Sequence, residues 1–313
     1  MLILGCMHIT LKQLQIIEAV VQTRSYSLAA ERLHMTQPAI SMQMKQLENN
    51  TGLIFFERQG KQIILTAAGE DIHQHSRQIT ANYNDLIDVI RETKDQHSGR
   101  IKVSAATTAN HLIIQMIADF SKINKDIKIA LKITNRERLV QQLQDFEPDI
   151  VLMGEPPTKL DLVSERLIMN PLFVIADPEH ELAKKKNIRF KEIAQYDFVV
   201  REQGSGTRVA IERFFKDRDE SFKSSLEMGS NEAIKHAVTA GLGLGIVSLH
   251  SIKLELEANK LVLLDVNQLP IKRYWHIVKR KGKRLLPAAK QFQDFMIKES
   301  GAYEESYKRF LKK

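Results

Sequence analysis

Apolar residues in the first fifty positions recur every three or four residues, which is the spacing of amphipathic helices. The pattern predicts a helix over about residues 11–21, a second over 27–33 and a third over about 37–50. Ser27 is expected to cap the second helix, and Pro38 falls in the first turn of the third, where proline is tolerated. Two short helices joined by a tight turn form a helix-turn-helix, whose second helix enters the major groove of DNA.

A short hairpin follows the third helix and adds a second possible contact with DNA. Its tip carries Arg58 and Lys61, and such a wing can touch the phosphate backbone or the minor groove. This hairpin makes a plain helical bundle the weaker interpretation. On the third helix, Gln37 can bond to an adenine edge and Lys45 to a phosphate. The predicted DNA-binding residues are Ser27, Arg32, Thr36, Gln37, Pro38, Ser41, Gln43, Lys45, Arg58 and Lys61.

Residues 67–98 predict one long helix, because they contain no proline and no glycine after Gly69. Apolar residues recur along it every seven positions and form a narrow seam flanked by polar residues. We expect this seam to pair with a second copy of the chain rather than to lie on its own domain. A dimer of this kind presents two recognition helices to a pseudo-palindromic site. The predicted dimerisation residues are Ile72, Ile79, Tyr83, Leu86 and Ile90.

Strand and helix patterns alternate over the remaining two-thirds of the chain, and this order predicts parallel sheets with helices on their faces. The predicted fold class is α/β, with an N-terminal α-helical winged helix-turn-helix and a C-terminal two-lobed domain like that of periplasmic binding proteins. The predicted boundaries are 8–66 for the DNA-binding domain, 67–98 for the linker helix, 99–300 for the regulatory domain and 301–313 for a tail. Within the regulatory domain, lobe I takes about 99–162 and 270–300, and lobe II about 163–269.

Polar residues follow several of the predicted strands, where ligands of open α/β sheets bind. The most informative segment is Gly204-Ser205-Gly206-Thr207, because glycines admit a close backbone approach and a helix start attracts anions. Nearby arginines can add charge-assisted bonds to phosphate or carboxylate. We expect a small anionic, phosphorylated metabolite between the lobes; ordinary turn and cap chemistry is the alternative. The predicted effector-binding residues are Thr107, Thr108, Asn135, Arg136, Glu155, Arg201, Gly204, Ser205, Gly206, Thr207, Arg208, Ser230 and Asn231.

Composition narrows the class of protein. The formal net charge is +8, but residues 1–98 carry 9 basic and 10 acidic residues, whereas residues 272–313 carry 13 and 4. Charge alone would therefore place a nucleic-acid site at the wrong end of the chain. The single cysteine, Cys6, excludes an intramolecular disulfide and a cysteine-rich zinc site, and no apolar run is long enough for a membrane helix. Residues 1–6 are too short for an export signal, so we expect a short extension before Met7 and a cytoplasmic protein.

Three other classes of protein compete with a DNA-binding regulator. No HExxH or GxSxG motif supports an enzyme, and a solute-binding protein would need an export signal. Residues 241–245 hold three glycines, but they follow a helix and enter a strand, the reverse of the dinucleotide-binding order, so we expect a tight turn. A regulator without an effector stays open. No cofactor or metal is expected; His73 and His75, two residues apart, point to different sides of their helix.

The motifs LKQLQIIEAV, SLAAERLHMTQPAISMQMKQLENNTGLIFFER and LTAAG fall in order over residues 11–69. They closely resemble the DNA-binding domain of LysR-type transcriptional regulators, although Met42 stands where many members carry arginine. REQGSGTRVAIERFF and MGSNEAIKHAVTAGLGLGIVS are similar to the carbon-fixation branch of that family, the CbbR, CmpR and RbcR group. The resemblance implies double-stranded DNA and RNA polymerase as partners, a homodimer that assembles into a homotetramer, and effectors such as phosphorylated sugars, other small phosphorylated metabolites or NADPH.

Overall fold

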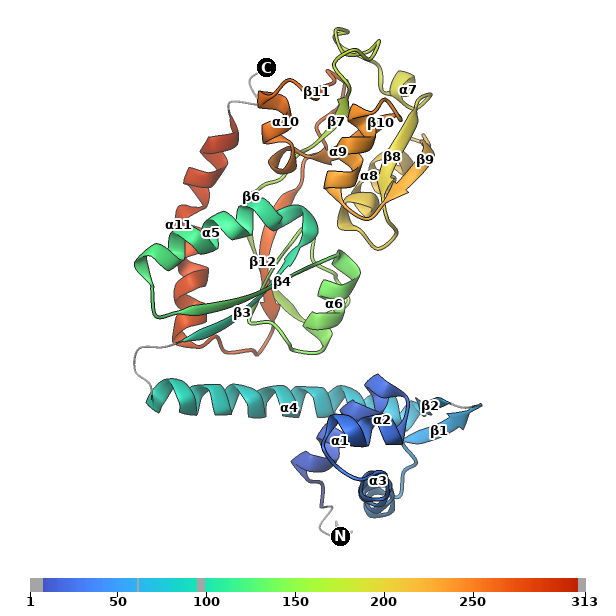
Figure 1. The fold of residues 1–313 in the computed structure, drawn as a ribbon, viewed down its shortest axis with the longest axis vertical. Helices are drawn as coiled ribbons and strands as arrows, with labels where there is room; N and C mark the ends of the chain where they lie inside the picture. The colour runs from blue at the N-terminus through green and yellow to red at the C-terminus, as the bar shows by residue number, and fades with distance from the viewer. Residues whose placement is uncertain (1–7, 61, 95–98, 309–313) are drawn as a thin grey trace. The chain divides into compact units, whose positions relative to one another are not determined.

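The computed structural model describes residues 8–60, 62–94 and 99–308, and it divides the chain into two compact units, Met1–Gln96 and His97–Lys313 (Figure 1). The predicted start at Met7, Lys61 at the hairpin tip and the last five residues of the tail lie outside the described residues. No helix in the described part of the chain is both long and apolar enough to cross a membrane.

The first unit is a helix-turn-helix followed by a hairpin and one long helix (Figure 1). Its elements are α1 (Leu11–Thr23), α2 (Tyr26–Arg32), α3 (Gln37–Thr51), β1 (Phe56–Gln59), β2 (Gln62–Leu65) and α4 (Ala67–Lys94). Thr10 caps α1 in a reciprocal capping box with Gln13. The predicted cap of α2 is wrong by two positions: Ser25, not Ser27, accepts a hydrogen bond from the Leu28 N–H. Ser27 therefore lies in the first turn of α2 and is exposed.

The core of this unit holds α3 and α4 in place. Ile40, Met44 and Leu47 of α3 are buried against α1 and Phe55. The first turn of α4 lies so close to the Phe55 carbonyl that a Cβ on Gly69 would come within 2.1 Å of that oxygen. Further along α4, Ser76 donates a hydrogen bond to the Leu14 carbonyl oxygen, which ties α4 to α1.

The apolar seam of α4 divides into two parts. Ile72 packs against the core of the first unit, so it stabilises this unit rather than forming part of the exposed dimerisation seam. Ile79, Tyr83, Leu86 and Ile90 are 40–53% exposed. The exposed stretch therefore begins one heptad later than the sequence predicted.

The second unit contains two sheets, which define two lobes (Figure 1). The sheet of lobe I has the strand order β4-β3-β5-β12-β6. The elements of lobe I are β3 (Arg100–Ala106), η1 (Thr107–Ala109), α5 (Asn110–Ile123), β4 (Lys128–Thr134), α6 (Arg136–Gln144), β5 (Ile150–Met153), β6 (Leu162–Met169), β12 (Tyr274–Arg280) and α11 (Pro287–Lys308). Alternate residues of β5 face opposite sides: Ile150 and Leu152 pack with α5 and α11, and Val151 and Met153 pack with α6.

The sheet of lobe II has the strand order β11-β7-β10-β8-β9. Its elements are β7 (Leu172–Ala176), α7 (Phe190–Ile193), β8 (Asp197–Arg201), α8 (Gly206–Lys216), β9 (Lys223–Met228), α9 (Asn231–Thr239), β10 (Leu244–Ser248), η2 (Leu249–Ser251), α10 (Lys253–Glu257) and β11 (Val262–Leu263). Helices α8 and α9 cover opposite faces of this sheet. The glycine-rich segment after α9 is the tight helix-to-strand turn that was expected: Gly243 has φ 137°, and a Cβ there would lie 2.5 Å from the Asp197 carbonyl oxygen.

The predicted fold class is confirmed, but two boundaries move. Strand β6 pairs antiparallel with β12 and buries Leu167 and Ile168 in lobe I, so lobe II begins near Leu172 rather than at residue 163. The second change concerns the predicted tail, because α11 continues to Lys308. Near its end, the Tyr307 ring stacks on His250 of lobe II with ring centroids 4.2 Å apart. Helix α11 therefore starts on lobe I and reaches lobe II.

Candidate functional site

The exposed face of α3 is the candidate DNA-reading surface. Thr36, Gln37, Pro38 and Lys45 are exposed, and the Gln37 amide nitrogen donates to the Ser41 hydroxyl at 2.9 Å. Thr36 precedes the helix without making a side-chain cap hydrogen bond. Gln43 is only partly exposed. The face is therefore polar at its N-terminal end and carries its basic group, Lys45, about two turns further along the helix.

The other predicted DNA contacts flank this helix. Ser27 and Arg32 are exposed on α2, and Arg58 is exposed on β1 of the hairpin. The hairpin is anchored to the helices by a hydrogen bond from the Ile63 N–H to the Arg24 carbonyl. Arg58 consequently projects from a fixed element of the same unit as α3.

A cavity of about 540 Å³ opens between the lobes of the second unit. It is lined by residues that follow β3, β4 and β5 of lobe I, by the first turns of α8 in lobe II, and by the segment that leads into β12. Eight of the thirteen predicted effector-binding residues line it: Thr107, Thr108, Asn135, Arg136, Glu155, Ser205, Gly206 and Thr207. The rule that ligands of open α/β sheets bind at the ends of strands therefore predicted the position of this cavity.

The N-terminus of α8 is built for a close approach to lobe I. Ser205 caps the helix by accepting a hydrogen bond from the Thr207 N–H, and both side chains are buried. Gly204 has φ 80°, and a Cβ there would lie 2.8 Å from a carboxylate oxygen of Glu137. A Cβ on Gly206 would lie 3.3 Å from Arg136 Cδ. The glycines thus let the free N–H groups of α8, which attract negative charge, reach the cavity wall.

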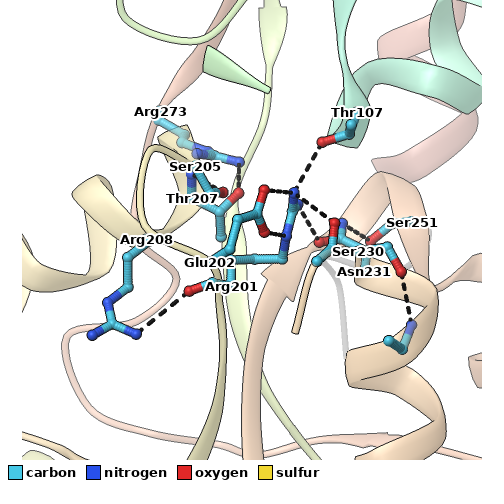
Figure 2. A network of polar contacts seen from close by, with 12 residues as sticks. Thr107, Arg201, Glu202, Ser205, Thr207, Arg208, Ser230, Asn231, Ser251 and Arg273 are labelled. Carbon is cyan, nitrogen blue, oxygen red and sulfur yellow. Dashed lines mark hydrogen bonds and ion pairs between the residues drawn. The ribbon is translucent and has the colours of Figure 1, made fainter. Parts of the chain in front are cut away.

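Arg201 is buried, and all three nitrogens of its guanidinium donate hydrogen bonds (Figure 2). Its Nε and Nη2 donate to the two carboxylate oxygens of Glu202 at 2.7 and 2.9 Å. Nη1 donates to Asn231 Oδ1 of lobe II, and Nη2 donates to Thr107 Oγ1 of lobe I. The side chain is 1% exposed. Arg201 was expected to hold the effector; its geometry instead makes it a buried link between the lobes.

Arg273 lines the cavity but is not among the predicted effector-binding residues. It directly precedes β12 and donates to the Thr207 hydroxyl and the Gly206 carbonyl at 3.3 and 3.4 Å (Figure 2). With its amide oriented so that both ends are satisfied, Asn170 accepts from Arg273 and donates to Ser248. No carboxylate of the described residues forms an ion pair with Arg273. Burial, together with the positive charge of Arg201, lowers the pKa of Arg273 to about 9.

The remaining predicted residues do not line the cavity. Arg208 Nε donates to the Glu212 carboxylate at 2.5 Å, and its guanidinium lies over the Phe222 ring. Figure 2 shows its other bond, from Nη1 to the Arg201 carbonyl oxygen. The prediction for Arg208 is therefore corrected: position i+4 on α8 offers it a carboxylate partner. Ser230 caps α9 by accepting from the Ala233 N–H, and Asn231 is held by Arg201 and Ser251. Neither residue lines the cavity.

Charge at the cavity is predominantly positive. The cations that line it are Arg136, Lys159, Arg213, Lys272 and Arg273, against Glu155 and Asp217. At the cavity mouth, Arg213 Nη1 lies 2.7 Å from Glu155 Oε2, but both side chains are more than half exposed, so this pair adds little stability. The described residues hold no cluster of histidine, cysteine and carboxylate ligands that suits a metal ion. The cavity fits a small anion.

Comparison with known proteins agrees with both halves of this description. The chain matches the family model of the bacterial regulatory helix-turn-helix protein, lysR family, over residues 11–70, and the LysR substrate binding domain over residues 94–301. It is 45% identical over 94% of its length to a RuBisCO operon transcriptional regulator of Allochromatium vinosum, of which it covers 97%. It is 36% identical over 92% of its length to the transcriptional activator CmpR of Synechocystis, of which it covers 95%.

Solved structures show the same fold. The regulatory domain of Synechocystis CcmR, solved in complex with 2-PG, is 35% identical, covers 65% of this chain and 98% of that chain, and superposes with a TM-score of 0.63. Full-length CbnR in complex with its target DNA is 19% identical, with a TM-score of 0.64 over 93% of this chain and 100% of that chain. The second likeness establishes the fold alone.

Proposed function

The chain belongs to the LysR family of DNA-binding transcriptional regulators, and from this premise we propose that it controls carbon-fixation genes in response to a small phosphorylated metabolite. The protein is a regulator and not an enzyme. The family binds DNA and effector metabolites and forms oligomers. The proposal concerns which effector and which genes.

One observation carries the effector class: Arg273 lines the cavity next to the N-terminus of α8, and no carboxylate of the residues that the structure describes pairs with it. A partly buried guanidinium without a counter-charge is costly, because only neutral oxygens replace its hydration. A phosphate placed there would receive charge-assisted bonds from Arg273 and weaker bonds from Thr207 and the helix N–H groups. The complex of the CcmR regulatory domain with 2-PG, which is 2-phosphoglycolate, supports a phosphorylated ligand in a domain of this type.

The gene target is inferred from relatives. Regulators named for the RuBisCO operon in two bacteria, Allochromatium vinosum and Acidithiobacillus ferrooxidans, are 45% and 37% identical to this chain over more than nine-tenths of its length. We infer that carbon-fixation genes are the targets. As a regulator of bacterial genes, the protein would act in the cytoplasm, where it would meet RNA polymerase at the promoter.

Exposed apolar residues on α4 support the proposed assembly. Ile79, Tyr83, Leu86 and Ile90 repeat at heptad spacing and remain 40–53% exposed in the single chain. Pairing of α4 with its copy would cover them and place two α3 helices on one pseudo-palindromic operator. A homotetramer, formed from two such dimers, is the oligomer that we propose.

The test is binding of 2-phosphoglycolate to the full-length protein by calorimetry, with glycolate as the non-phosphorylated control. Arg273→Gln is expected to weaken phosphate-ester binding by about ten-fold or more, because it removes a charged hydrogen bond. Arg208→Gln, which removes a guanidinium that does not line the cavity, is the matched control and is expected to leave affinity unchanged. Equal affinity of the Arg273→Gln and wild-type proteins for 2-phosphoglycolate would show that Arg273 does not bind the ligand.

Footprinting on the DNA upstream of the chain's own gene connects binding to regulation. The experiment is run at fixed salt, with and without 2-phosphoglycolate, sugar phosphates and NADPH, because salt controls affinity for DNA. A dyad footprint that shortens or shifts with one phosphorylated compound supports the proposal and identifies the effector. A dyad footprint that responds to none of them, or only to non-phosphorylated compounds, overturns the effector class and retains the regulator.

A further inference from the structure

The DNA-reading helix α3 carries unusually little positive charge for its task. Its fifteen residues contain one lysine, Lys45, and no arginine, and they also contain Glu48. The first 98 residues of the chain hold 9 basic and 10 acidic residues. Guanidinium contacts with guanine, the commonest specific readout of the major groove, are therefore unavailable to α3. Apart from Lys45, the groups that this helix offers for base recognition are amides, hydroxyls and apolar side chains.

Met42 is a long, exposed apolar side chain on this helix. Its side chain is 63% exposed, whereas Met44, two residues further along the same helix, is 1% exposed in the core. Positions 38, 42 and 45 share one helix face because they are four and three residues apart. Met42 thus lies between Pro38 and the expected phosphate ligand Lys45, at the middle of the exposed face. Nothing in the described part of its own unit covers it.

The neighbouring polar residues favour A·T pairs. The Gln37 amide is already oriented by its hydrogen bond to Ser41, and glutamine pairs with the adenine edge. The thymine of an A·T pair presents a C5-methyl group in the major groove, which apolar side chains contact. Methionine is unbranched and polarizable, so it adapts to such a small apolar target.

We propose that Met42 determines operator specificity by packing its side chain on the C5-methyl group of a thymine in each half-site. The inference concerns the DNA sequence that the regulator reads, so it does not depend on the phosphorylated effector. Burying one methyl group predicts a preference for thymine over deoxyuridine of about four-fold in affinity at each contacted base. No hydrogen bond of the base pair changes in that comparison.

The experiment begins with operators selected from random duplexes by the full-length protein. Each thymine of the selected site is replaced in turn by deoxyuridine, and dissociation constants are measured at fixed salt for the wild type, Met42→Ala and Met42→Leu. At one thymine position of each half-site, the wild type is expected to lose about four-fold in affinity and Met42→Ala to lose nothing. Met42→Leu, which keeps an apolar side chain, is expected to retain part of the preference.

Ile54→Ala is the matched control, because Ile54 is 67% exposed in the same unit but lies outside α3. Its profile of deoxyuridine effects is expected to equal that of the wild type. A second selection with Met42→Arg is expected to exchange the A·T pair at the contacted position for G·C, since arginine pairs with guanine. The proposal is overturned if deoxyuridine has no effect at any position, or if the wild type and Met42→Ala lose equal affinity at the same thymines.

Discussion

His250 provides a sharp test of how the regulatory domain is held together. It lies in η2, directly after β10 of lobe II, with 5% of its surface exposed and its ring stacked on Tyr307. Within the described structure its Nδ1 has no hydrogen-bond partner. Burial lowers the pKa of His250 from 6.5 to about 4, and the charge of Arg273 acts in the same direction, against a backbone hydrogen bond at Met169. The folded protein therefore keeps this imidazole neutral.

The sign and size of the effect on stability follow from this pKa. The unfolded chain binds the proton more tightly, so the stabilising contribution is complete above about pH 6.5 and is lost as the pH falls towards 4. At 1.36 kcal/mol for each pKa unit, the full loss below pH 4 is about 3 kcal/mol. Between pH 7 and pH 5, the wild type should lose about 2 kcal/mol from this group.

The measurement is urea unfolding at pH 7 and pH 5, followed by the fluorescence of Trp275, the single tryptophan of the chain, which lies in the core of lobe I. His250→Gln removes the titrating group, and every other ionisable residue stays the same. The wild type should lose about 2 kcal/mol more than His250→Gln between the two pH values. Equal losses in the two proteins would refute the assignment of this pH dependence to His250.

Three further outcomes are expected from the geometry. Gly69→Ala should destabilise the DNA-binding domain by several kcal/mol and lower its melting temperature, because its Cβ would lie 2.1 Å from the Phe55 carbonyl oxygen; an unchanged melting curve would contradict the close approach. Arg201→Met should lower the free energy of unfolding, measured in urea, by about 3 kcal/mol or more, because Glu202, Thr107 and Asn231 lose their hydrogen-bond partner. An unchanged free energy of unfolding would show that this network does not hold the lobes together. Tyr307→Ala should speed amide hydrogen exchange in residues 249–251, whereas Tyr307→Phe, which keeps the stacked ring, should not; equal exchange in both would exclude the stack as the cause.

Local patterns predicted the first unit well, because a helix-turn-helix is specified by short-range spacing and caps. The error there was local too: Ser25 and Ser27 are both plausible caps, and the backbone selects Ser25. The boundary between the lobes was predicted wrongly for a different reason. The prediction placed residues 163–169 in lobe II, but β6 pairs with β12, which lies more than a hundred residues later in the sequence, and no local pattern shows that pairing. The sequence therefore predicted the helices and strands more reliably than it predicted which of them pair with one another.

The candidate cavity shows the same limit at the level of single residues. The rule that ligands bind at the carboxyl ends of strands works for β3, β4 and β5, which run parallel. Strand β12 is antiparallel to β5, so its beginning, not its end, lies at that edge of the sheet. For this reason Arg273 was not predicted as an effector-binding residue. Arg201 does follow the rule, but no sequence pattern shows that the adjacent Glu202 occupies its guanidinium.

The two arginines have different electrostatic positions, and this difference suggests how an anion would act on the domain. Arg201 has its counter-charge in Glu202 and joins Thr107 of lobe I to Asn231 of lobe II, which in turn donates to Ser251 of η2. Arg273 has no carboxylate partner in the described part of the chain. Its pKa is lowered by burial and, in part, by the charge of Arg201, so the two cations destabilise each other in this arrangement. An anion bound at Arg273 would remove that repulsion only while the lobes stay together. Its binding energy would therefore favour this arrangement over any in which the lobes part, which is the differential affinity that a regulatory ligand requires.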